Sequence, residues 1–90
     1  MPKRVDKNQA TIVAELRRLG FSVLHLHMVG RGCPDLLVGR HGINLLVEIK
    51  SSKVAKFTEA EIKFAASWDG SLIAAYRTED ILNWFELQED

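Results

Sequence analysis

The chain has 90 residues, which is enough for one domain with a single core but too few for two. Apolar residues make up 47% and charged residues 27%, a balance that argues against disorder, and no apolar run approaches the roughly 20 residues of a membrane span. The first residues lack the apolar core of a signal peptide, and the single cysteine excludes an internal disulfide and a thiolate zinc cluster. We therefore expect a soluble protein of the cytoplasm.

The formal net charge is zero, but the two signs are separated along the chain. Residues 1–58 carry ten Lys and Arg against four Asp and Glu, whereas residues 59–90 carry two against eight. This asymmetry is a hint of a face that binds a polyanion such as nucleic acid. An acidic tail on a solvated surface explains the charges equally well.

The first predicted element is a helix over about residues 6–19. An apolar stripe at helical spacing and a following glycine support it: Val5, Ile12, Leu16, Leu19 and Gly20. Gln9 lies on the same stripe, where a polar side chain needs a reason. Either Asp6 caps the helix and Gln9 reaches back to it, or Gln9, with its neighbours Asp6 and Asn8, faces a functional site. Glu15 lies off the stripe and is predicted to be exposed.

Residues 21–29 alternate in hydrophobicity and predict the first strand. His25 and His27 would share one face as a possible metal pair, although surface or partner-contact histidines are commoner. Gly30, Arg31 and Gly32 then form a turn that allows close backbone approach. Arg31 either meets a phosphate there or belongs to a plain connector.

Two apolar runs within residues 32–50 predict a β-hairpin that turns at His41 and Gly42. Counting outward from this two-residue loop places Asp35 directly opposite Glu48. Lys50 shares a strand face with Glu48, because side chains alternate along a strand. Two opposed carboxylates repel each other unless a positive charge lies between them, and a divalent metal ion would remove the conflict.

The remaining residues predict a helix, a strand and a second helix. After a basic connector over residues 51–57, Thr58 and Glu61 form a capping box for a helix that ends near Trp68, with Trp68 expected in the core. Residues 71–77 predict the last strand, and Thr78 is expected to cap a short helix that ends near Phe85. The order α-β-β-β-α-β predicts one α/β domain over residues 1–90, with a mixed sheet flanked by helices.

An acid pair and a lysine on one sheet face match the needs of phosphodiester hydrolysis. Mg²⁺ or Mn²⁺ would be held by the carboxylates of Asp35 and Glu48 and by the backbone carbonyl of Ile49. Lys50 would orient the attacking water or stabilise the charge that develops on the phosphorane, or act as the base. We also expect Arg31, Lys53 and Lys56 to contact DNA.

These residues carry a resemblance to a known family. Pro34-Asp35, twelve further residues and Glu48-Ile49-Lys50 resemble the PD-(D/E)xK nuclease motif. The wider pattern is similar to the stand-alone VRR-NUC domains of phages and bacteria over about residues 6–84, and it consists of Gly30 to Val38, Val47 to Ser51, Phe57-Thr58, Glu61 and Trp68.

The resemblance implies a restriction-endonuclease-like fold and a metal-dependent, structure-selective DNA endonuclease. Such an enzyme acts on junctions or flaps as a homodimer, like the related Holliday junction resolvases, in a bacterial host or encoded by its phage. Asp35 and Glu48 would bind the metal, and Lys50 would be the catalytic lysine. Many relatives place a carboxylate on the first helix, where this chain offers Gln9, and the family often has Gln where Glu61 stands.

Two other functions compete with this interpretation. A non-catalytic nucleic-acid or protein-interaction module would retain the fold without the activity, but it would be expected to have lost the trio of Asp35, Glu48 and Lys50. A small restriction-type endonuclease would read sequence, but 90 residues leave little surface for base readout.

Overall fold

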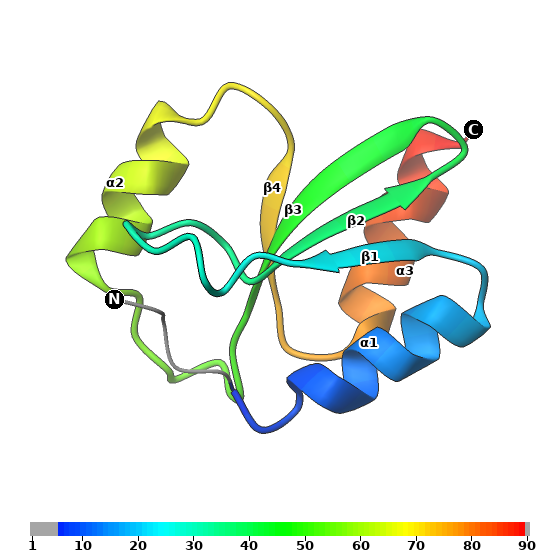
Figure 1. Ribbon diagram of the computed structural model, residues 1–90, viewed down its shortest axis with the longest axis horizontal. Helices are drawn as coiled ribbons and strands as arrows, with labels where there is room; N and C mark the ends of the chain where they lie inside the picture. The colour runs from blue at the N-terminus through cyan, green and yellow to red at the C-terminus, as the bar shows by residue number, and fades with distance from the viewer. Residues whose placement is uncertain (1–5, 90) are drawn as a thin grey trace.

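A four-stranded mixed sheet with three helices forms the protein, as Figure 1 shows for the computed structural model, which describes residues 6–89. The elements are, in chain order, α1 (Gln9–Arg18), β1 (Ser22–His25), β2 (Leu36–Arg40), β3 (Ile43–Ile49), α2 (Glu59–Ser67), β4 (Leu72–Ala75) and α3 (Thr78–Gln88). Strands β1, β2 and β3 are antiparallel neighbours, and β4 joins β3 in parallel after the α2 crossover. The predicted fold class and element order are confirmed. No helix in the described part of the chain is long and apolar enough to cross a membrane.

The core lies between one face of the sheet and the helices α1 and α3, which Figure 1 shows together on one side of the molecule. Its largest buried side chains come from α1, the strands and α3: Leu16, Leu36, Leu45, Ile49, Ile81 and Phe85. Phe21 packs edge-on against Phe85, with ring centroids 5.1 Å apart. Burying apolar side chains of this size contributes roughly 1.5–3 kcal/mol each, so this layer dominates the stability of the fold.

Helix α1 ends because the chain after it adopts a conformation that suits glycine. Gly20 has a φ of +94°, and its N–H donates to the Arg17 carbonyl while Phe21 N–H donates to Leu16. This pair of bonds is the Schellman motif, which satisfies carbonyls that the helix leaves open. The predicted stop is confirmed, but the prediction that Leu19 is buried is wrong, since it lies beyond the last helical residue and is exposed. Val5, the first residue of the predicted apolar stripe, lies outside the described residues.

The hairpin turns at the two predicted residues. His41 and Gly42 both have positive φ, at 51° and 80°, as a two-residue type I′ turn requires. Arg40 pairs with Ile43, and the register continues to Leu36 opposite Val47. This is the predicted register, so the next residue on each strand is Asp35 and Glu48.

Helix α2 stands apart from the other two helices, on the opposite side of the molecule in Figure 1. Glu61 is its single buried residue, and Phe64 is half-buried. The prediction that Trp68 is in the core is wrong: its side chain is 47% exposed and stacks on Phe64, with ring centroids 5.5 Å apart. Ile62 is exposed as well, because the side of α2 that faces the protein centres on Glu61.

Further boundaries differ from the sequence-based prediction, among them those of β4, which is shorter than the predicted residues 71–77. Strand β1 ends at His25 rather than at Val29, and residues 27–29 form a turn. Thr78 is the first residue of α3 rather than its cap, which is Arg77, and its hydroxyl donates to the carboxylate of Glu15 on α1. Glu15, predicted to be a free surface charge, therefore ties α1 to α3. Helix α3 also continues past Phe85 to Gln88.

Candidate active site

Asp35 lies at the point where β2 and β3 separate. Its backbone precedes β2, so the N–H of Ile49 has no β2 carbonyl to bind, and the Asp35 carboxylate accepts it instead at 2.7 Å. The side chain is 1% exposed. A buried carboxylate that accepts a backbone N–H is fixed in orientation. Asp35 thus holds the hairpin together at the end where Glu48 lies.

Glu48 and Lys50 lie on the face of β3 turned away from the main core. Alternate residues Leu45, Val47 and Ile49 belong to the core, so Glu48 and Lys50 point to the opposite face. Both residues are nevertheless buried, at 4% and 8% exposure of the whole residue. Charged side chains are rarely buried without a partner, because the loss of hydration costs several kcal/mol per ion.

The ammonium group of Lys50 is surrounded by the connector between β3 and α2. It donates to Glu61 Oε1 at 2.9 Å and to the Lys56 carbonyl at 3.3 Å, and it lies 4.9 Å from the centre of the Phe57 ring. Glu48 Oε2 is farther away, at 3.7 Å. Lys50 therefore lies between two carboxylates and is bonded to Glu61.

Glu61 has two partners, Thr58 and Lys50, of which the sequence predicted only Thr58. Its carboxylate accepts from Thr58 N–H at 2.9 Å, and its own N–H donates to the Thr58 hydroxyl at 3.1 Å, which completes the predicted capping box. The same oxygen, Oε1, accepts from Lys50. Glu61 thus closes the cap of α2 and adds a carboxylate beside the lysine.

The start of α1 reaches the same end of the sheet. The helix cap is Asn8, without a side-chain capping bond, so of the two alternatives the one in which Asp6 caps the helix and Gln9 reaches back is wrong. The Asn8 amide instead donates to the carbonyls of Lys50 at 3.2 Å and Tyr76 at 2.9 Å. Asn8 therefore fixes the backbone of the predicted catalytic lysine.

Gln9 is buried to 1% exposure and points to β1. Its amide nitrogen lies 3.3 Å from His25 Nδ1. His25 pairs with Leu36, and the next residue, Leu26, donates its N–H to the Asp35 carbonyl. Gln9 thus contacts the strand β1 next to the end of the hairpin that carries Asp35, and its part in the site stays a prediction.

The two histidines do not share a strand face as predicted, because β1 ends at His25 and His27 lies in the following turn. Their rings are 5.9 Å apart and nearly perpendicular. Within residues 6–89, no group of three or more His, Cys, Asp or Glu side chains is placed to hold a metal ion. Among the described residues, no His, Cys, Asp or Glu side chain therefore joins His25 and His27 as a third metal ligand.

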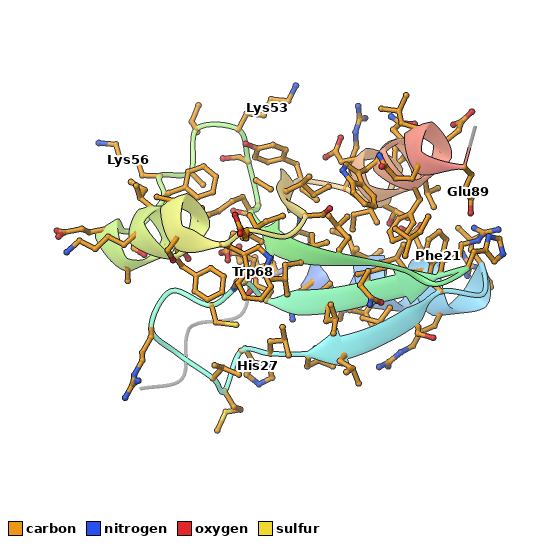
Figure 2. The ribbon with its side chains drawn as sticks, turned by 90° about the horizontal axis from the view of Figure 1, so that it is seen from above. Phe21, His27, Lys53, Lys56, Trp68 and Glu89 are labelled. Carbon is orange, nitrogen blue, oxygen red and sulfur yellow. The ribbon has the colours of Figure 1, made fainter. Side chains whose placement is uncertain are left out.

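The basic residues predicted to contact DNA are all exposed. Figure 2 shows Lys53 and Lys56 projecting from the β3–α2 connector away from the strands, with His27 on the opposite side of the sheet. Arg31 has a positive φ of 58° between two glycines of positive φ. The lysines therefore lie on the segment whose backbone surrounds Lys50.

A small cavity of about 40 Å³ lies between α2 and the sheet. Glu48 and Glu61 reach it, and its other walls are mainly apolar: Gly32, Pro34, Phe57, Phe64, Ala65, Leu72 and Ala74. The volume is comparable with the share of roughly 30 Å³ that one water occupies in the liquid. The site thus has room for a water-sized group beside its two glutamates.

The donor atoms fit the divalent metal ion that the resemblance implies. Asp35, Glu48 and the Ile49 carbonyl offer hard oxygen atoms, which Mg²⁺ and Mn²⁺ prefer. Among the described residues, the buried oxygens Asn8 Oδ1 and Gln9 Oε1 have no hydrogen-bond partner, which marks acceptors in need of one. Mg²⁺ takes one or two protein carboxylates and keeps several waters, so a two-carboxylate site suits it.

Sequence reasoning did not find two of the contacts at this site. The bond from Asn8 to the Lys50 carbonyl spans 42 positions of the chain, and no local pattern announces it. The pair of Lys50 with Glu61 joins a strand to a helix cap. The opposite charges of these residues are a signal in the sequence, but the connector between them leaves their distance undetermined.

Comparisons with known proteins do not identify the chain. No protein-family model matches it, and a search of curated proteins found no similar sequence.

Proposed function

We propose that this protein is a metal-dependent endonuclease of the VRR-NUC type that hydrolyses phosphodiester bonds in branched DNA. The observation that carries the proposal is the burial of Asp35, Glu48 and Lys50 at one end of the sheet. A solvated strand face would leave these side chains in water. Burying three charges is costly, and sites of catalysis are where proteins retain such groups.

Each side chain has a role that its contacts support. Asp35 and Glu48, with the Ile49 carbonyl, would hold Mg²⁺ or Mn²⁺. The bound ion would polarise the scissile phosphate and lower the pKa of a bound water. Lys50 has three N–H donors, of which Glu61 and the Lys56 carbonyl take two. The third donor is directed by these two bonds and serves a water or phosphate oxygen, where a positive charge stabilises the transition state.

The charged connector supports DNA as the partner. Lys53→Ala combined with Lys56→Ala is expected to weaken DNA binding and to reduce the slope of log K against log salt by about 2, since each lost phosphate contact removes about 1. Cleavage at saturating DNA should stay unchanged, because Lys50 binds the backbone of Lys56 and not its side chain. Fluorescence anisotropy at several salt concentrations measures the slope.

A matched control for the two lysines is Lys63→Ala. Lys63 is an exposed lysine on α2 that pairs with Glu59 at 3.0 Å. Its removal should leave the slope within error of the wild type. An unchanged slope in the double variant would place the DNA path elsewhere.

The homodimer remains part of the proposal. Large apolar side chains are exposed on α2 and in the turn after β1: Met28, Val29, Ile62 and Trp68, at 69%, 62%, 58% and 47%. Exposed apolar surface is a feature of protein interfaces. We expect light scattering to give twice the mass of the chain, and the monomer mass would contradict this part.

A panel of DNA substrates tests the activity. Purified protein is expected to cut flapped, forked or four-way substrates faster than linear duplex in the presence of Mg²⁺ or Mn²⁺, and to stop when EDTA is added. Binding of branched DNA without cleavage under any metal would favour the non-catalytic module. Cleavage of linear DNA at defined sequences would favour the restriction-type enzyme.

A further inference from the structure

The ammonium of Lys50 depends on one short segment for its partners. Residues 56–61 supply the Lys56 carbonyl, the Phe57 ring and the Glu61 carboxylate. The carbonyl oxygen, the centre of the ring and the carboxylate oxygen all lie within 5 Å of the ammonium nitrogen. The first turn of α2 therefore sets where the lysine points. Of these contacts, the one to Glu61 is the shortest and the one that carries a full opposite charge.

The position of α2 is itself fixed at this turn. Gly32 has a φ of +78°, and a Cβ at this position would lie 2.1 Å from the Ala60 carbonyl oxygen. The turn before β2 thus packs its backbone directly against the first turn of α2. Since Glu61 is the helix's buried residue, α2 is held at the site through its N-terminal turn.

We infer that Glu61 is a positioning residue that holds the Lys50 ammonium away from Glu48. This inference rests on the proposed nuclease function. The ammonium is within hydrogen-bond distance of Glu61, at 2.9 Å, but not of Glu48, at 3.7 Å. A lysine without Glu61 would close on Glu48 and neutralise a carboxylate that the metal needs. Glu61 thereby keeps the lysine available for the substrate and Glu48 available for the metal.

The test compares variants that separate this role from helix capping. Glu61→Ala removes the partner of Lys50 and is expected to lower single-turnover cleavage by about 10²-fold, since misplacing a group by about 1 Å costs that much. Calorimetric affinity for Mn²⁺, measured without DNA, should fall by about tenfold, as for other residues that orient metal ligands. The KM for DNA should remain that of the wild type, and Glu61→Gln, which retains an acceptor for both donors, should recover most of the turnover.

Two controls come from the same helix turn. Thr58→Ala removes the hydroxyl that caps Glu61 N–H but leaves the Glu61 carboxylate, so it should lower stability and leave turnover and Mn²⁺ affinity unchanged. Glu59→Ala removes an exposed acid that pairs with Lys63, and it should change neither. Equal losses in Thr58→Ala and Glu61→Ala would show that capping alone is responsible and would overturn the inference.

Glu61→Asp covers the case in which Glu61→Ala does not fold. It retains the negative charge at the start of α2 but ends one methylene short of the lysine. Wild-type turnover and Mn²⁺ affinity in this variant would overturn the positioning role. If the wild type cuts no DNA, the proposed nuclease function fails, and the Mn²⁺ affinities still decide whether Glu61 controls Glu48.

Discussion

Asp35→Asn and Glu48→Gln are each expected to lower metal-dependent cleavage by about 10³-fold or more. Each substitution removes a negative oxygen donor, and a metal ion contributes several kcal/mol to the stabilisation of the transition state, where about 1.4 kcal/mol equals a factor of ten. The amides are close to the acids in shape. In Asp35→Asn the amide oxygen can still accept the Ile49 N–H, which preserves the end of the hairpin.

The measurement combines single-turnover cleavage with calorimetric Mn²⁺ binding and thermal unfolding. Both variants should lose metal affinity together with activity while they retain a cooperative unfolding transition. Glu59→Gln serves as the control, because Glu59 is an exposed carboxylate on the first turn of α2. Wild-type cleavage by either site variant would defeat its assignment as a metal ligand.

Lys50→Met is expected to abolish turnover and to destabilise the protein by about 3–5 kcal/mol, because it removes the cation of a buried ion pair. The side chains of Lys50 and Glu61 are only 10% and 8% exposed, so water cannot compensate for the loss. Small domains are stable by about 5–15 kcal/mol, which makes this a large fraction of the total. Urea unfolding measures the change, and Mn²⁺ binding should persist.

A double-mutant cycle with Glu61→Gln isolates the ion pair. The double variant Lys50→Met/Glu61→Gln is expected to be more stable than Lys50→Met alone, because the buried negative charge of Glu61 has been removed as well. Effects that add to within about 0.5 kcal/mol would mean that the two side chains are not coupled. Lys50→Met that no longer binds Mn²⁺ would contradict the proposal that this lysine acts in turnover and not in metal binding.

The hairpin was predictable because its information is local. The His41-Gly42 pair dictates a two-residue turn with positive φ, and that turn fixes the register of every residue on both strands. The relation of Asp35 to Glu48 follows from this count. The capping box of Thr58 with Glu61 was equally local, since both residues belong to one helix turn.

The first turn of α1 shows where local rules fail. Asp6 and Gln9 have the spacing of a capping box, yet the helix cap is Asn8, two residues later, and the Gln9 side chain contacts His25 on β1. Trp68 has the size and spacing of a core residue, but α2 offers the protein mainly the polar side chain of Glu61. Gln9 thus follows a partner distant in the chain, whereas Trp68 stays exposed because the buried side of α2 lies elsewhere.

The sequence by itself determined the fold class, the hairpin register and the trio of Asp35, Glu48 and Lys50, because turn chemistry and strand alternation act over a few residues. Only the tertiary structure decided how the lysine is held. Its partners, Glu61 on α2 and Asn8 at the start of α1, reach it across connectors whose path depends on packing. Hydrophobic periodicity predicts which side of a helix or strand is buried, but it does not predict which other element packs against that side.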